Sequence, residues 1–412
     1  MRSLFQGDAD ARRRRDRVLG AIFLFFLVFL VARAARKDGG VLVRNQEFGG
    51  RFLAGEDPYF DPARGHRVHG PYPPSFVLVA APLSLLPTPL ARIAWGSAQA
   101  LALVAAFVVL RRWSTRFWPS AAPHAPVLFA AAILLASRYL LRDSAGGGGN
   151  LLFAMLALVG LDLAFAGRGA LAGLPLALSL VLKPNLAPLL LFLAFRRRWT
   201  SLASTLILGA ALFLLPAAWF GLEDYLDLAA RWTRDVASYA AVEDPGRPDL
   251  VPDGMPVSDS SMNQSLREAS GRLARAVGAS PSLAAWTARA VALALGAAAC
   301  AVALRARPGR REVLAALAFL PLALLLSPIS WKAHHVALLP LFFALACEAF
   351  MASSRTLTIL LGATWVACGL LSEEIVGETA KEVLQGLSIV TIFDVLLLAA
   401  ALVHARSSDE AP

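Results

Sequence analysis

Polar residues able to do chemistry are concentrated in five short stretches that lie between long apolar segments. In chain order they are Asp38, Glu47 and Tyr72; Arg138 and Asn150; Lys183; Asn263 and Gln264; and His334 and His335. A carboxylate can act as a general base on a hydroxyl, while cations and amides can stabilise a phosphate leaving group. The set therefore indicates group transfer from a phosphate-linked donor to a hydroxyl, at a site half in lipid.

The residue types indicate separate roles within this set. Asp38 is our first candidate for the base and Glu47 the second. We expect Lys183, helped by Arg138 and by His334 or His335, to hold the donor phosphate. The amides and one phenol complete the predicted binding residues: Asn150, Asn263, Gln264 and Tyr72. Adjacent histidines cannot share one helical face, so the pattern predicts neither a metal site nor a cofactor.

Each of these residues also has a simpler interpretation. Loop carboxylates are usually solvated, and a Lys beside a Pro can extend to the membrane interface. The glycine run 146–149 is typical of a flexible turn, since no Walker lysine follows it. Asn263-Gln264-Ser265 matches a glycosylation acceptor, a pattern that is common by chance. Asp394 lies inside an apolar segment, where we expect it to be structural and paired.

Composition places the chain in a membrane. Its 412 residues are 57% hydrophobic and 17% charged, which is too apolar for an ordinary soluble domain. The net charge of +10 comes from Arg clusters at the ends of apolar segments. That placement predicts contact with membrane lipids and no nucleic-acid partner.

Charge at the segment ends predicts a multi-pass topology with both termini in the cytoplasm. Residues 1–17 and 405–412 form basic or polar tails, and 18–404 form one membrane catalytic domain. We expect an all-α bundle of about twelve spans, with outer loops at 37–92 and 221–280. Ser75–Leu86 is predicted to be an interfacial helix on the outer face, and Lys183-Pro184 the turn of a short hairpin. All five polar stretches then share the outer face.

Several short motifs occur in the order found in a known family. They are Gly55-Glu56-Asp57-Pro58-Tyr59, Tyr72-Pro73-Pro74, Gly149-Asn150-Leu151-Leu152, Leu182-Lys183-Pro184, Asn263-Gln264-Ser265-Leu266 and Ser327-Pro328-Ile329-Ser330-Trp331 before His334-His335. The ordered set resembles glycosyltransferase family 87. This resemblance implies a C-type glycosyltransferase fold and a polyprenyl-phosphate sugar donor, typically of mannose. It also implies a lipid or glycan acceptor, and an active site on the extracytoplasmic face of the cell (inner) membrane.

The chain departs from the family pattern at two places. Leu42 stands where family members carry an Asp before the Gly-x-Asp-Pro-Tyr stretch, and only glycines precede Asn150 where they show Gly-Gln-x-Asn. Asp38 and Glu47 flank the first position. Two alternatives to catalysis therefore stay open: a transporter or flippase of polyprenyl-linked glycans, and a degenerate family member that acts as an assembly subunit.

Overall fold

The computed structural model describes residues 9–37, 40–61, 63–68, 70, 72–242, 248–251, 253, 262–370 and 373–406. Nearly all of these residues are helical. Within these ranges the only strands are β1 (Phe60–Asp61) and β2 (His66–Arg67), which form a small antiparallel hairpin. The predicted all-α membrane class is confirmed.

Seven helices in the described ranges are long and apolar enough to cross a membrane. They are α1 (Ala9–Arg36), α4 (Thr88–Phe117), α5 (Ala125–Gly146), α9 with α10 (Trp199–Leu214 and Ala217–Phe220), α13 (Pro281–Arg305), η6 with α16 (Lys332–Leu338 and Leu339–Met351) and α20 (Ile389–Arg406). An eighth span would combine α7 (Gly169–Leu182) with η4 and α8 (Pro184–Leu186 and Pro188–Phe195), which bend by 118° at Lys183. The bend predicted at Lys183-Pro184 is therefore present.

The predicted count of twelve spans is not confirmed, because several apolar segments form short or broken helices. These are α6 (Asn150–Phe165), α14 (Arg310–Leu317) followed by α15 (Phe319–Leu326), and α17 (Arg355–Thr364), which continues as a π-helix to Leu370. In α15 every side chain but Leu326 is buried. Such a segment is apolar because protein surrounds it, and its hydropathy resembles that of a lipid-facing helix.

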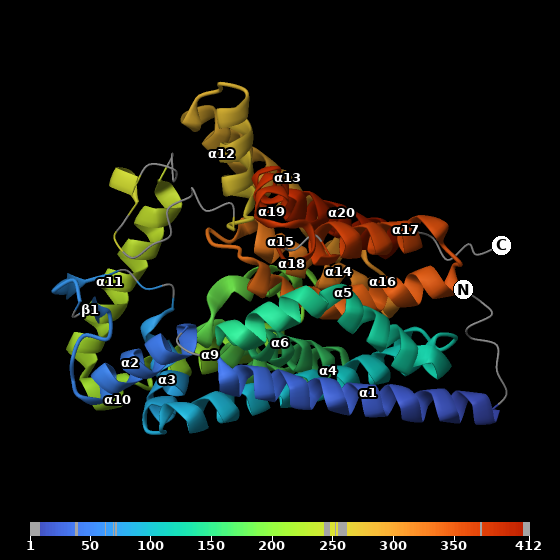
Figure 1. The fold of residues 1–412 in the computed structure, drawn as a ribbon, viewed down its shortest axis with the longest axis horizontal. Helices are drawn as coiled ribbons and strands as arrows, with labels where there is room; N and C mark the ends of the chain where they lie inside the picture. The colour runs from blue at the N-terminus through green and yellow to red at the C-terminus, as the bar shows by residue number, and fades with distance from the viewer. Residues whose placement is uncertain are drawn as a thin grey trace.

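The long helices run along one direction, and the molecule has two distinct ends (Figure 1). The start of α1 and the end of α20 lie at one end, which we call the terminal end. The opposite, distal end holds α2 (Val41–Leu53), α3 (Val77–Ser84) and α11 (Leu222–Ala241). The predicted interfacial segment 75–86 contains α3, which at eight residues is about 12 Å long and too short to span.

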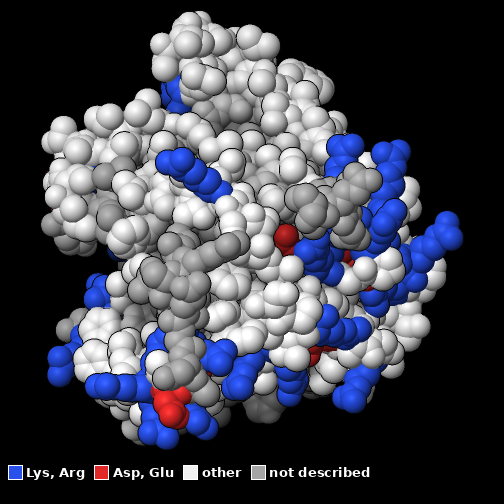
Figure 2. All heavy atoms as spheres, turned by 90° about the vertical axis from the view of Figure 1, so that its right-hand side faces the viewer, with Lys and Arg blue, Asp and Glu red and all other residues white. Residues whose placement is uncertain are grey.

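Basic side chains gather on the terminal end, as Figure 2 shows. They include Arg12–Arg15 at the start of α1, Arg116 at the end of α4, Arg305 at the end of α13 and Arg406 at the end of α20. Here Glu312 of α14 also pairs with Arg196 and Arg198, at 3.2 and 2.6 Å. The positive-inside rule predicts that this end faces the cytoplasm, which would turn the distal end outward.

Candidate active site

A cavity of about 1710 Å³ opens in the distal end. Its walls come from the end of α1, from α2, and from the segment between α2 and α3, which we call the first loop. The end of α5, the α7–η4 bend, η6 and α11 also contribute. We call it the distal cavity. The sequence-predicted residues that line it are Glu47, Tyr72, Arg138, Asn150, Lys183 and His334. Segments distant in sequence thus meet around one space.

Lys183 lies at the centre of the cavity's polar contacts. Its Nζ donates to Asn150 Oδ1 at 2.5 Å and lies 3.3 Å from His334 Nε2. The ammonium also lies over the Tyr72 ring, 5.3 Å from its centroid. Among the described residues no carboxylate is within ion-pair distance of it. Because an ammonium has three N–H groups, one donor and the positive charge stay available to an anion in the cavity.

Asn150 is oriented by Asp143, a buried residue of α5 that the sequence analysis did not select. Asp143 Oδ1 accepts hydrogen bonds from the Asn150 amide group at 2.6 Å and from its backbone N–H at 3.2 Å. Asp143 Oδ2 accepts the Leu151 N–H at 2.9 Å, so the carboxylate satisfies the N-terminus of α6. Since Nδ2 faces Asp143, Oδ1 faces Lys183. An acidic residue three positions before a glycine run was the available signal.

His334 presents one ring nitrogen to Lys183. Its Nδ1 lies 3.1 Å from the Ile329 carbonyl oxygen, which can only accept a hydrogen bond. The backbone N–H of Trp331 also points at Nδ1, at 3.3 Å. The nearby ammonium favours the tautomer with an Nε2 lone pair, so we assign the proton to Nδ1. Trp331 stacks on the imidazole with the ring planes 12° apart, and both side chains line the cavity.

The glycine run 146–149 forms a packed turn that brings α2 beside Asn150. Gly147 and Gly149 have φ of 74° and 65°, in the region that favours glycine. A Cβ on Gly147 would lie 2.9 Å from Leu42 Cβ, and one on Gly149 would lie 2.3 Å from the Trp95 ring. Leu42 is buried in the same cluster as Trp95. The predicted turn is present, and close packing holds it.

The structure describes only one of the two residues predicted to be the base. Asp38 lies outside the described residues. Glu47 is exposed on α2, lines the distal cavity and makes no hydrogen bond or ion pair with the described part of the chain. Asp143 also lines the cavity, but its oxygens are engaged by three N–H groups. Glu47 is therefore the described carboxylate best able to accept a proton.

Asn263, Gln264 and His335, which the sequence analysis proposed as substrate-binding residues, do not line the cavity. Asn263 Oδ1 accepts the Ser330 N–H at 2.8 Å, and its Nδ2 donates to the Pro328 carbonyl at 2.9 Å. Gln264 Nε2 donates to the Gln385 carbonyl at 3.1 Å. All three side chains are buried, so Asn263 is also a poor glycosylation acceptor. Asn263 and His335 hold the segment 328–331 before η6, and Gln264 holds the Gln385 carbonyl.

His335 forms a buried pair with Asp394. Its Nε2 lies 2.8 Å from Asp394 Oδ2, and its Nδ1 lies 3.0 Å from the Trp331 carbonyl. Asp394, the carboxylate inside an apolar segment, is thus paired with His335, which the sequence analysis places in the site. The pair joins η6 to α20 and fixes the start of the segment that carries His334.

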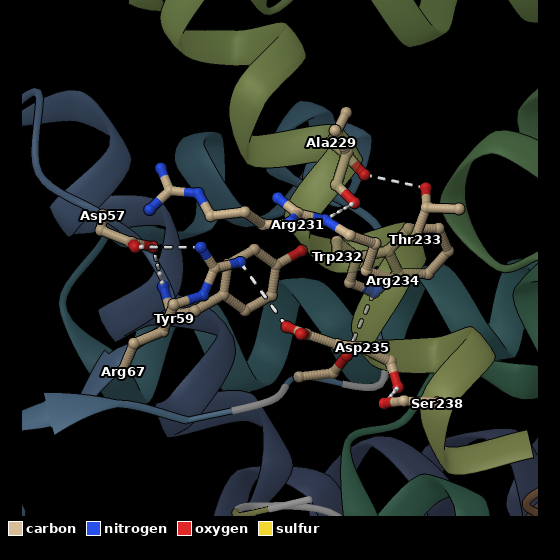
Figure 3. Close-up of polar contacts among 12 residues, drawn as sticks. Asp57, Tyr59, Arg67, Ala229, Arg231, Trp232, Thr233, Arg234, Asp235 and Ser238 are labelled. Atoms are coloured by element: carbon tan, nitrogen blue, oxygen red, sulfur yellow. Dashed lines mark hydrogen bonds and ion pairs between the residues drawn. The ribbon is translucent and has the colours of Figure 1, made fainter. Parts of the chain in front are cut away.

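Arg67 fastens the first loop to α11 (Figure 3). Its guanidinium lies between Asp57 at 3.5 Å and Asp235 of α11 at 3.8 Å, and 5.0 Å from the centroid of the Tyr59 ring. Trp232 donates its indole N–H to the Gly70 carbonyl at 3.1 Å. Burial raises the pKa of Tyr59, which stays neutral. Tyr59 and Trp232 line the cavity, so these contacts build one of its walls.

Cations outnumber carboxylates on the cavity lining. The end of α1, α2 and the first loop contribute Arg33, Arg36, Lys37, Arg44, Arg51 and Arg64. Later segments of the chain contribute Arg138, Arg142, Lys183, Lys332 and Lys381. The lining carboxylates are Glu47, Asp61, Asp143 and Glu373. Such a surface raises the local concentration of anions.

The fold and the cavity define the class: a mainly helical membrane protein with a cationic cavity at one end. Comparison with known families makes this specific. The model of glycosyltransferase family 87 matches residues 71–328, more than half of the chain, and the chain belongs to this family. No curated protein matches the sequence.

The family match confirms the predicted resemblance and implies glycosyltransferase activity. It covers Tyr72, Arg138, Asn150 and Lys183, four of the residues on the cavity lining. The motif 55–59 lies outside the matched range, and the motif that runs from Ser327 to His335 lies outside it after Pro328.

Proposed function

We propose that the protein transfers a hexose, mannose in the first instance, from a polyprenyl-phosphate donor to a hydroxyl of a lipid or glycan. The reaction would occur at the outer face of the cell (inner) membrane. The observation that carries this proposal is Lys183, whose ammonium lines the distal cavity and is within ion-pair distance of no carboxylate among the described residues. A buried or half-buried cation of this kind is suited to an anionic leaving group.

In this mechanism the donor phosphate binds at Lys183, with Arg138 as a second cation. The acceptor oxygen attacks the anomeric carbon from the face opposite the phosphate, and its proton passes to a carboxylate. The bond between that carbon and the phosphate oxygen breaks, and its electron pair leaves with the polyprenyl phosphate. Lys183 stabilises the growing phosphate charge, and the sugar configuration inverts. We assign the base to Glu47, or to Asp38 as the sequence analysis proposes.

His334 and Tyr72 support this reaction by positioning Lys183. The His334 Nε2 lone pair and the Asn150 oxygen hold the ammonium from two sides, and the Tyr72 ring packs beneath it. These groups direct the charge into the cavity. The proposal is supported by these contacts, because Asn150, His334 and Tyr72 all contact the same ammonium group.

The transporter alternative calls for ionisable residues near the bilayer midplane and paired broken helices. The described residues contain one bent helix pair, and the cavity lies at one end of the molecule. Both observations favour transfer over transport.

The test uses the full chain in proteoliposomes with labelled polyprenyl-phosphate mannose and a lipid acceptor extract. Turnover should fall by about 10²–10⁴-fold in Glu47→Gln or in Asp38→Asn, whichever residue is the base. Glu56→Gln is the matched control, since Glu56 is exposed and lies off the cavity lining. Full activity in both variants would remove both residues from the base role. Movement of intact labelled lipid across the bilayer without cleavage would identify a transporter.

A further inference from the structure

The buried pair of His335 and Asp394 holds one more proton than a neutral histidine and a carboxylate would. Both ring nitrogens of His335 face oxygen atoms. Nδ1 is 3.0 Å from the Trp331 carbonyl oxygen, which can only accept, and Nε2 is 2.8 Å from Asp394 Oδ2. The hydrogen bond at Nδ1 takes the single ring proton of a neutral imidazole. The contact at Nε2 therefore needs a second proton, on the imidazole or on the carboxyl group.

This pair is not required for the stability of an apolar bundle. Apolar side chains of similar volume are often as stabilising as a buried ion pair, and ionisable residues inside membrane segments usually serve a site. His335 and Asp394 are both buried and neither lines the distal cavity. Any role in the site must then pass through a neighbour that reaches the cavity.

Trp331 and His334 supply that connection. The Trp331 carbonyl oxygen accepts the Nδ1–H of His335 and also the backbone N–H of His334, at 2.8 Å. The Trp331 indole stacks on the His334 imidazole, and both side chains line the cavity. His334 Nε2 in turn lies 3.3 Å from the Lys183 ammonium. A continuous series of contacts thus leads from Asp394 to Lys183.

A second hydrogen bond from α20 holds the same segment. Thr391, one turn before Asp394, donates its hydroxyl to the Gln264 carbonyl oxygen at 2.8 Å. The Gln264 backbone N–H donates to the Ser330 carbonyl oxygen, also at 2.8 Å. The last helix therefore fixes residues 330–331 from two sides, although no residue of α20 lines the cavity.

We infer that Asp394, through the proton it shares with His335, is a positioning residue for Lys183 and hence for the donor phosphate. The identity of that phosphate rests on the proposed function. Asp143 orients Asn150 on one side of the ammonium, and Asp394 would orient His334 on the other. Two carboxylates that do not touch Lys183 would then set the direction of its charge.

The shared proton is tested by NMR of the full chain in micelles with selectively labelled histidine. A proton held between Nε2 and Oδ2 should resonate far downfield in the unchanged protein, and it should disappear in both Asp394→Asn and His335→Gln. It should persist in Glu348→Gln, which changes a buried carboxylate that accepts the Trp118 indole N–H at 2.6 Å and lies off the cavity. Absence of this proton from the unchanged protein would overturn the inference.

The positioning role is tested by the affinity for dodecyl phosphate of the full chain in phosphatidylcholine nanodiscs. Lys183→Met defines the part of the binding that depends on Lys183. Asp394→Leu, which leaves Nε2 without a partner, should weaken that part by about tenfold, the loss typical of one charged hydrogen bond. Asp394→Asn should bind normally, because an amide can donate to Nε2 while Nδ1 keeps its proton.

Glu348→Leu is the matched control, since it also removes a buried carboxylate that is hydrogen-bonded, and it should retain the affinity. Unchanged affinity in Asp394→Leu would remove Asp394 from the positioning role. An equal loss in both leucine variants would reduce that role to general stability and also contradict the inference.

Transfer assays separate this inference from the proposed function. In Asp394→Leu, kcat per folded molecule should fall by about 10–10²-fold, as misplacement of a binding group does, while the acceptor KM stays unchanged. A rise in the acceptor KM alone would contradict a role at the donor phosphate. A chain that transfers no sugar, yet shows the predicted pattern of dodecyl phosphate binding, would refute the proposed function and leave the positioning role intact.

Discussion

The contacts of the Lys183 ammonium distinguish a residue of the active site from a lysine that merely extends to the membrane interface. An interfacial Lys would point its ammonium toward lipid headgroups. Here the ammonium is held by Asn150 and His334 within the cavity. Asp143 fixes the orientation of Asn150, so the position of the charge depends on a carboxylate that does not touch Lys183 directly.

Replacing Lys183 tests its role. We expect Lys183→Met to insert and fold normally, because the change removes a charge from a partly apolar place. Sugar transfer should fall by about 10²–10³-fold, the loss typical of one charge-stabilising donor. Lys183→Arg, which retains the charge, should keep part of the turnover. Normal transfer in Lys183→Met, measured in proteoliposomes with matched protein amounts, would remove Lys183 from the site.

A second residue-scale prediction concerns pH and the exposed pair of His66 with Asp253. His66 Nε2 lies 2.5 Å from Asp253 Oδ2, and this hydrogen bond raises the pKa of His66. The same contact lowers the pKa of Asp253. The pair is therefore intact below the ordinary His pKa and is lost as pH rises through the raised value. It is also lost as pH falls through the lowered pKa of Asp253.

The measurement is the His66 pKa, followed by NMR with selectively labelled histidine in micelles. It should lie above the ordinary value of about 6.5 and return toward it in Asp253→Asn. Glu56→Gln, which changes a carboxylate of the same loop that does not touch His66, should leave the pKa of His66 unchanged. An unshifted pKa in the unchanged protein would show that the pair does not form in solution.

At the scale of elements, the turn between α5 and α6 decides whether Asn150 reaches Lys183. Gly149 has a positive φ, and a Cβ added to it would overlap the six-membered ring of Trp95. Gly146, in the same run, is part of α5, and a Cβ added to it would meet nothing within 4 Å. One glycine is therefore required by its contacts, and the other is not.

Alanine at each position separates these cases. Gly149→Ala should destabilise the protein by about 2–4 kcal/mol, from the left-handed backbone and from overpacking against Trp95. Gly146→Ala should be neutral or slightly stabilising, since alanine favours a helix. Thermal unfolding in detergent, monitored with transfer activity, measures both. Equal stability of the two variants would contradict the packed turn.

At the scale of the whole molecule, the two ends differ in where their cations lie. Cationic side chains gather on the surface of the terminal end (Figure 2), while those of the distal end line the cavity. The cytoplasm should therefore face the terminal end, and the sugar donor should be used on the other side.

Cysteine labelling tests this orientation. In a chain without its three native cysteines, Thr115→Cys at the end of α4 should be protected from an impermeant maleimide in intact cells. Glu223→Cys at the start of α11 should be labelled. Both positions are exposed in the structure, so access depends on the membrane side. The reverse pattern would invert the topology and place the cavity in the cytoplasm.

The helical membrane class, the family and the bend at Lys183-Pro184 could all be predicted from the sequence. These follow from local properties: apolar content, short motifs, and a proline that cannot donate a backbone hydrogen bond. The sequence also selected six residues that the structure brings together on one cavity.

Which polar residues reach the cavity and which support it depends instead on how the helices pack. His335 pairs with Asp394, fifty-nine positions away, and Asn263 pairs with the loop before η6. Asp143 entered the site because α5 and α6 meet at a tight turn. The number of full-length spans was likewise undetermined, because hydropathy cannot distinguish a helix buried in protein, such as α15, from one that faces lipid. Partner choice depends on distances between segments, which local sequence patterns do not contain.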